Sequence, residues 1–126
     1  DPALIVHGHF EIDGGHDGAR RLLTAAAPPT MIVTANNLMM MGMMRCIVQL
    51  GLRCPSEISV LSIDDVPWAE GFTPRLSAVA QPVREMGRRV VQLLADRIEQ
   101  GAEKPAAQRL FQPQLRMRDS VGPPPR

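Results

Sequence analysis

The sequence has 126 residues, enough for one modest domain or for a part of a larger one. Its 44% hydrophobic and 21% charged residues are typical of a soluble globular protein, and its net charge at pH 7 is only +1. This balance excludes a strongly basic surface, so we expect no nucleic-acid contact by this segment itself. No apolar run approaches the roughly 20 residues that a membrane span requires, so we expect no membrane partner either.

The two cysteines, Cys46 and Cys54, are too few to predict a disulfide framework and favour a reduced, cytoplasmic location. No CxxC or cysteine–histidine spacing predicts a metal site, and we expect no cofactor. The sequence begins with Asp1 and Pro2 instead of methionine and shows no signal segment. We therefore expect it to be cut from a longer chain.

Short apolar runs alternate with helical periodicity in the first part of the chain. The run 3–6 predicts a buried strand that Gly8 ends. The periodicity over 15–26 predicts a helix, which the proline pair beginning at Pro28 ends. The β-branched run 31–34 then predicts a second strand.

The middle of the chain continues this alternation. Asn36 and Asn37 can cap a helix over 38–50, and Gly51 is placed to end it. The apolar run 58–63 predicts a third strand.

The last part begins with an irregular segment over 66–75, which contains two prolines and a glycine. A short strand over 76–80 and a long amphipathic helix over 83–100 come next. After a loop over 102–107, residues 110–118 predict a final extended run.

Strand–helix alternation with helices of these lengths predicts an α/β fold built on a parallel sheet. The strand candidates are apolar throughout, as expected of strands covered on both faces. Ligands of such open sheets bind outside the carboxyl ends of the strands. The residues that follow the strands are therefore the candidates for a binding site.

Three residues with recognition chemistry each follow a predicted strand: Phe10 the first, Asn36 the second and Asp64 the third. An aromatic face, an amide and a carboxylate together suit a small ring-shaped effector such as a sugar or a nucleobase. Each residue also has a purely structural explanation. Phe10 could be a core aromatic, Asn36 a helix cap and Asp64 a brace for the turn that follows it. Their joint placement favours a site.

Several motifs resemble those of bacterial transcription regulators of the LacI/GalR type. The run from Thr34 to Met39, followed by Gly42, is similar to that family's Ala-Asn-Asp element. The run from Gly51 to Val60 is similar to its Gly-Leu-Arg element. Further matching positions follow in family order over nearly the whole chain: Gly8, Phe10, Ile63, Asp64, Asp65, Phe72, Pro74, Leu76, Gln81, Pro82, Met86, Gly87, Arg88 and the run from Leu115 to Ser120.

The resemblance implies a fold like that of type I periplasmic sugar-binding proteins, with two α/β subdomains facing each other across a ligand cleft. Residues 1–82 would then belong to the C-terminal subdomain, and 83–107 would form a helix of an otherwise missing N-terminal subdomain. Residues 108–120 would return to the C-terminal subdomain, and 121–126 would be a disordered tail.

The resemblance also implies a small-molecule effector that modulates operator binding. Its contacts would come from Phe10, Asn36, Asp64 and Gln81, and DNA would be bound only by a helix-turn-helix head outside this chain. His9 and Asn37 stand where the family usually has aspartates, and Ser62–Ile63 replaces a glycine and an aromatic residue. These departures leave the identity of the effector open.

Five of the thirteen residues in the run from Leu38 to Leu50 are methionines. One face of this helix must cover the sheet, and the other can form a subunit contact. The resemblance implies a homodimer, with its interface at Leu38, Met41, Met44 and Phe72. A wholly intramolecular core is the alternative.

Two other functions share parts of this pattern. A secreted sugar-binding protein of a transporter would have the same fold, although the run from Gly51 to Val60 resembles the regulators. An enzyme or phosphoacceptor could use Asp64 and Asp65, but no nucleophile motif accompanies them or the histidines of the first turn. We therefore expect a binding protein and not an enzyme.

Overall fold

The computed structural model describes residues 1–100 and 108–125. The chain divides into two compact units. The first consists of Asp1–Ala80 and Leu115–Arg126, and the second of Gln81–Gln114. The predicted boundary at residue 82 lies two residues beyond Ala80, the end of the first unit's main segment.

A four-stranded sheet forms the centre of the first unit. Its strands lie in the order β1 (Met31–Thr34), β2 (Ser59–Ile63), β3 (Ser77–Ala80) and β4 (Gln114–Arg116). β1 pairs with β2, and β2 with β3, in parallel. The predicted α/β class with a mostly parallel sheet is confirmed, although the final extended run shortens to the three residues of β4.

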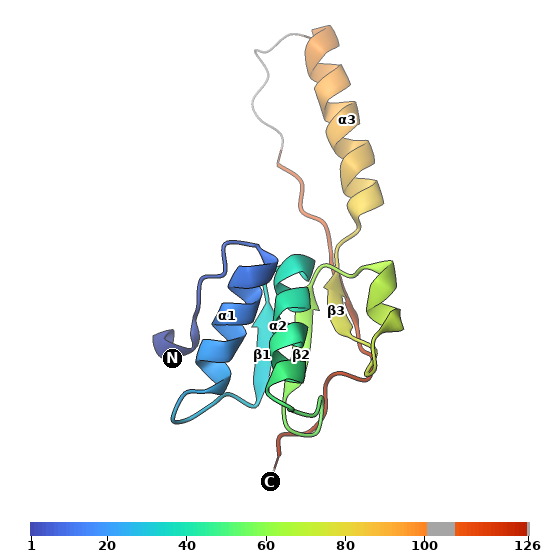
Figure 1. The fold of residues 1–126 in the computed structure, drawn as a ribbon. Coiled ribbons are helices and arrows are strands. Elements are labelled where there is room, and N and C mark those ends of the chain that lie inside the picture. The colour runs from blue at the N-terminus through green and yellow to red at the C-terminus, as the bar shows by residue number, and fades with distance from the viewer. Residues whose placement is uncertain (101–107, 126) are drawn as a thin grey trace. The chain divides into compact units, whose positions relative to one another are not determined.

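Two helices, α1 (Ile12–Leu23) and α2 (Asn37–Gln49), lie side by side on one face of this sheet (Figure 1). The core between helices and sheet is aliphatic and sulfur-rich. Its fully buried members include Met40, Met43, Cys46, Ile47, Ile58, Val60 and Leu76. Burying this apolar surface is the main stabilising contribution of the unit.

Glycines allow the two helices to pack closely. A Cβ at Gly15 would collide with the carbonyl oxygen of Met39, and one at Gly42 would collide with that of Ile12. Glycine at these two positions therefore permits backbone contact between α1 and α2. α1 starts three residues before the predicted start and ends at Leu23, three residues before the predicted end.

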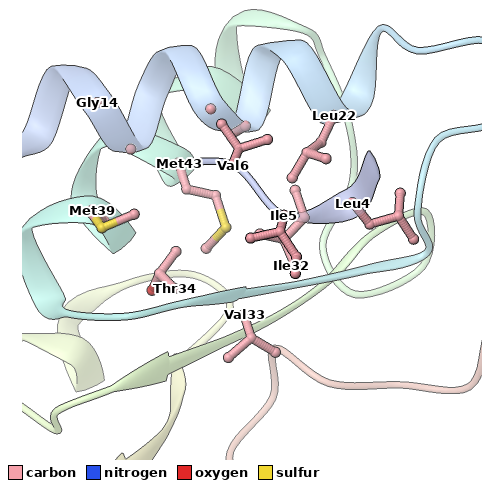
Figure 2. A pocket seen from close by; sticks show the side chains of 13 residues that line it. Leu4, Ile5, Val6, Gly14, Leu22, Ile32, Val33, Thr34, Met39 and Met43 are labelled. Carbon is pink, nitrogen blue, oxygen red and sulfur yellow. The ribbon is translucent and has the colours of Figure 1, made fainter. Parts of the chain in front are cut away.

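The predicted first strand over 3–6 is wrong. Pro2–Leu4 form a short 3-10 helix, because the Asp1 carboxylate accepts a 2.9 Å hydrogen bond from the Ala3 amide and Pro2 presets a helical φ. Local capping chemistry therefore outweighs the apolar pattern. The run still lies against α1 and β1, and a cavity of about 210 Å³ remains between them (Figure 2).

The second half follows the predicted order of elements. The irregular segment contains a 3-10 helix, η2 (Pro67–Gly71), and α3 (Val83–Gln100) has its predicted bounds. The predicted loop over 102–107 lies outside the described residues. The tail is anchored at its start, since Gly122 donates a 3.1 Å hydrogen bond to Ser59 Oγ, so the prediction of disorder from residue 121 is wrong at that point. Across the residues described, no helix combines the length and apolar character needed to cross a membrane.

Candidate ligand-binding site at the strand ends

Two of the predicted site residues follow neighbouring parallel strands. Thr34 pairs with Ser62 in the register of β1 and β2, and Thr34 Oγ1 donates a 3.2 Å hydrogen bond to Ser62 Oγ. Asn36 and Asp64 each come two residues later. Because parallel strands end at the same edge of a sheet, both residues lie at one edge of the first unit.

The Asn36 side chain joins two segments at this edge. Its Oδ1 accepts a 2.8 Å hydrogen bond from the Met39 amide and so caps α2. Its Nδ2 donates a 3.0 Å hydrogen bond to the carbonyl oxygen of Phe10. The amide keeps a second N–H and a second lone pair, so the structural role as a cap leaves it able to contact a ligand.

Phe10 is not a core aromatic, since 62% of it is exposed. His9 and Phe10 both have positive φ, 52° and 60°, and the Glu11 amide closes their turn with a 3.1 Å hydrogen bond to the Gly8 carbonyl. This conformation costs about 1–2 kcal/mol for a residue with a side chain, and such strain is concentrated at functional sites. The turn therefore leaves the Phe10 side chain exposed while its backbone carbonyl is held by Asn36.

Asp64 is the third residue with positive φ, at 71°. It directly follows β2, is half-buried, and donates its amide to the Val79 carbonyl of β3 over 3.1 Å. The backbone that carries its carboxylate is therefore held by β2, which it follows, and by β3, to which it is hydrogen-bonded.

Asp65, next in the chain, is held by arginines from the C-terminal segment. Arg118 contacts both of its carboxylate oxygens at 2.8 and 2.9 Å, and Arg116 adds a contact of 2.9 Å. The hydrogen bonds that Arg118 donates to Asp65 lower the pKa of Asp65 and raise the pKa of Arg118. This pairing was not predicted, because Arg118 follows no strand end and no pattern in the sequence links it to Asp65.

Gln81, the fourth predicted contact, is exposed and follows the last residue of β3. It begins the second unit, and its carbonyl oxygen accepts a 2.9 Å hydrogen bond from the Val83 amide at the start of α3. Its contact with a ligand remains a prediction.

Comparison with known proteins identifies the fold family. The model of the periplasmic binding protein-like domain matches residues 5–121. The chain belongs to this family. This membership confirms the predicted fold. The predicted resemblance to LacI-type regulators is confirmed by the relatives described next.

These relatives are transcriptional repressors. The domain is 35% identical over 119 residues to the HTH-type transcriptional repressor PurR of Vibrio vulnificus, covering 93% of this chain and 35% of that protein. It is 33% identical over 99 residues to the ribose operon repressor of Haemophilus influenzae, covering 79% of this chain and 30% of that protein. The chain thus spans about a third of the length of these relatives.

A solved structure gives the same result. The LacI family transcriptional regulator from Enterococcus faecium, with bound ribose, superposes with a TM-score of 0.78 and 30% identity. The alignment covers 90% of this chain and 41% of that one. These comparisons favour the regulators over the transporter alternative.

The residues predicted to form a subunit contact of this periplasmic binding protein-like domain divide into two groups. Leu38 and Met41 lie on the outer side of α2 and are 42% and 39% exposed. Met44 is only 6% exposed and belongs to the core. Phe72 is half-buried, and its ring lies 5.9 Å from that of Trp68. A subunit contact would therefore depend on Leu38, Met41 and the exposed part of Phe72.

Proposed function

We propose that this chain is the effector-sensing part of a LacI-type transcription regulator and binds a small ring-shaped molecule at the edge formed by Phe10, Asn36 and Asp64. The observation that carries the proposal is the hydrogen bond from Asn36 to the Phe10 carbonyl. It fixes an exposed aromatic residue at the strand edge that Asp64 also occupies. A flat apolar face beside polar groups suits a sugar or a nucleobase.

Each side chain has a distinct role in this proposal. The Phe10 ring stacks on the ligand, and the Asp64 carboxylate accepts hydrogen bonds from hydroxyl or ring N–H groups. Asn36 positions Phe10 and offers its remaining N–H.

The proposed mechanism is a shift of populations. The ligand bridges two subdomains and favours the closed arrangement, which changes the spacing of DNA-binding heads in a dimer. Those heads lie outside this chain, and the protein acts in the cytoplasm as a homodimer. Leu38, Met41 and Phe72 supply the subunit contact from this chain.

We infer binding and not catalysis for two reasons. The relatives are repressors. The Asp65 carboxylate, one of the two acidic candidates, is paired with Arg116 and Arg118.

Thermal-shift measurements on the intact gene product with D-ribose and with hypoxanthine test the proposal. A ligand that binds the folded state raises the melting temperature. We expect one of the two to do so, and Asp64→Ala to abolish the shift, because a hydrogen bond to a charged group contributes about 1.5–3 kcal/mol. Asp96→Ala, an exposed carboxylate on α3, is the control and should respond like the wild type. An undiminished shift in Asp64→Ala would refute the role of Asp64.

A further inference from the structure

The adjacent aspartates after β2 have different surroundings. The Asp65 side chain is 7% exposed and that of Arg118 is 10% exposed, so their ion pair is largely shielded from water. Arg118 also donates to the Leu76 carbonyl over 2.6 Å and to Glu70 Oε1 over 3.2 Å. Every one of these residues belongs to the first unit. Through Arg118, Asp65 is therefore linked to Glu70 in η2 and to Leu76 beyond it.

Asp64 sits between two fixed points. Its own amide is hydrogen-bonded to Val79 on β3, and the next residue along the chain is clamped by Arg118. A φ of 71° is less favourable than a negative φ even for aspartate, which adopts it more readily than most residues. Strained conformations of this kind persist only where the surroundings over-determine them. If the ion pair between Asp65 and Arg118, here called the Asp65 clamp, were removed, Asp64 could relax toward negative φ, and its carboxylate would change direction.

We propose that Asp65 and Arg118 are positioning residues, which hold Asp64 in its left-handed conformation and so aim its carboxylate at the effector. The part of this proposal that concerns the effector rests on the proposed function. The part that concerns the backbone of Asp64 does not. Neither Asp65 nor Arg118 needs to contact the ligand.

A simpler role for this ion pair would be to fasten the C-terminal segment to the sheet. A second ion pair on the same segment, whose side chains are more exposed at 59% and 49%, serves as a control for that role. Arg75 contacts both oxygens of Asp119 at 2.6 and 3.0 Å, and so fastens the same C-terminal segment next to Arg118. This second pair does not involve Asp65. Loss of Arg75 should therefore loosen the segment without releasing Asp64.

The experiment compares Arg118→Met with Arg75→Met in the intact gene product. The first measurement is hydrogen exchange of the Asp64 amide, which reports local opening. We expect exchange to accelerate by at least about tenfold in Arg118→Met and to change by less than about twofold in Arg75→Met. Equal exchange at Asp64 in the two variants would overturn the proposal. Should Arg118→Met fail to fold, Arg118→Lys replaces it, since lysine keeps the charge but cannot contact both carboxylate oxygens in the same way.

The second measurement is the affinity for D-ribose or hypoxanthine, whichever stabilises the wild type. We expect Arg118→Met to bind at least about tenfold more weakly and Arg75→Met to bind like the wild type. Faster exchange at Asp64 with unchanged affinity would overturn the positioning role. Failure of the proposed function gives a different result. Asp64→Ala itself would then bind normally, while hydrogen exchange of the Asp64 amide in Arg118→Met would still test the role of the Asp65–Arg118 ion pair.

Discussion

Asn36 and Phe10 are joined by a 3.0 Å hydrogen bond from the side-chain amide of the first to the backbone carbonyl of the second. The same amide caps α2 through Met39. The start of a core helix and an exposed, strained turn therefore share one side chain. A change at Asn36 should affect both, and the two effects can be separated by the choice of substitution.

Asn36→Ala should lower the free energy of unfolding by about 1 kcal/mol or more, because it removes the cap. Asn36→Asp should keep the cap, since aspartate caps equally well, but it loses the donor to Phe10. We expect Asn36→Asp to unfold at nearly the wild-type urea concentration while its Phe10 turn becomes mobile and its ligand affinity falls. Equal loss of stability in both variants would show that the cap is not the main contribution of Asn36.

Two glycines inside helices should respond oppositely to alanine. Gly42→Ala places a Cβ against the Ile12 carbonyl, so we expect destabilisation of about 1–3 kcal/mol. Gly87→Ala places the new Cβ with no neighbour within 4 Å beyond the nearby backbone of its own helix, and alanine favours helix by up to about 1 kcal/mol. Urea unfolding of the two variants measures the difference. Similar stability in both would contradict the close packing of α1 on α2.

The elements with regular apolar patterns could be predicted from the sequence. β1, α2, β2 and α3 appear within one residue of their predicted bounds, because helices buried on one face and short apolar runs leave a clear pattern. β1 is nevertheless covered on one face only, since Met31 and Val33 are exposed. The errors arose where local chemistry competes with that pattern. Capping by Asp1 turned the predicted first strand into a 3-10 helix.

The site could be predicted only in part. The strand-end rule applies to Asn36 and Asp64, which follow β1 and β2. Phe10 follows a 3-10 helix and not the predicted strand, so the rule does not account for its position. The rule could not reveal that Asn36 holds the Phe10 carbonyl or that Asp65 pairs with Arg118, since both contacts depend on folding distant segments together. Met44 illustrates the same limit, because the sequence does not fix which methionines of α2 face inward.

Acid should weaken the Asp65 clamp. Arg118 lowers the pKa of Asp65 by hydrogen-bonding its charged form. A lowered pKa stabilises the fold above the unfolded value of about 3.9, and this contribution is lost as pH falls through the folded value. The stability difference between wild type and Asp65→Asn should therefore be largest near neutral pH and shrink toward pH of about 2. Urea unfolding of both proteins across this pH range measures the stability difference. A stability difference that does not change with pH would contradict the prediction.

Two methionines of similar exposure test the subunit contact. Met41 on α2 is 39% exposed, and Met31 on β1 is 38% exposed. Met31 alternates with the buried Ile32, so it lies on the opposite face of the sheet from α2. We expect Met41→Glu to convert the dimer of the intact gene product to monomer and Met31→Glu to leave it dimeric, because a charge in an interface core is costly. Sedimentation velocity distinguishes these outcomes, and a dimeric Met41→Glu would exclude this side of α2.

The central claim is that a ring-shaped ligand binds at the strand ends. Backbone amide chemical shifts, recorded by NMR while D-ribose or hypoxanthine is added to the intact gene product, test it most directly. The account predicts that the largest changes occur at Phe10, Asn36 and Asp64. Changes centred instead on the cavity beside Ile5 and Leu22, with those three amides unmoved, would contradict it.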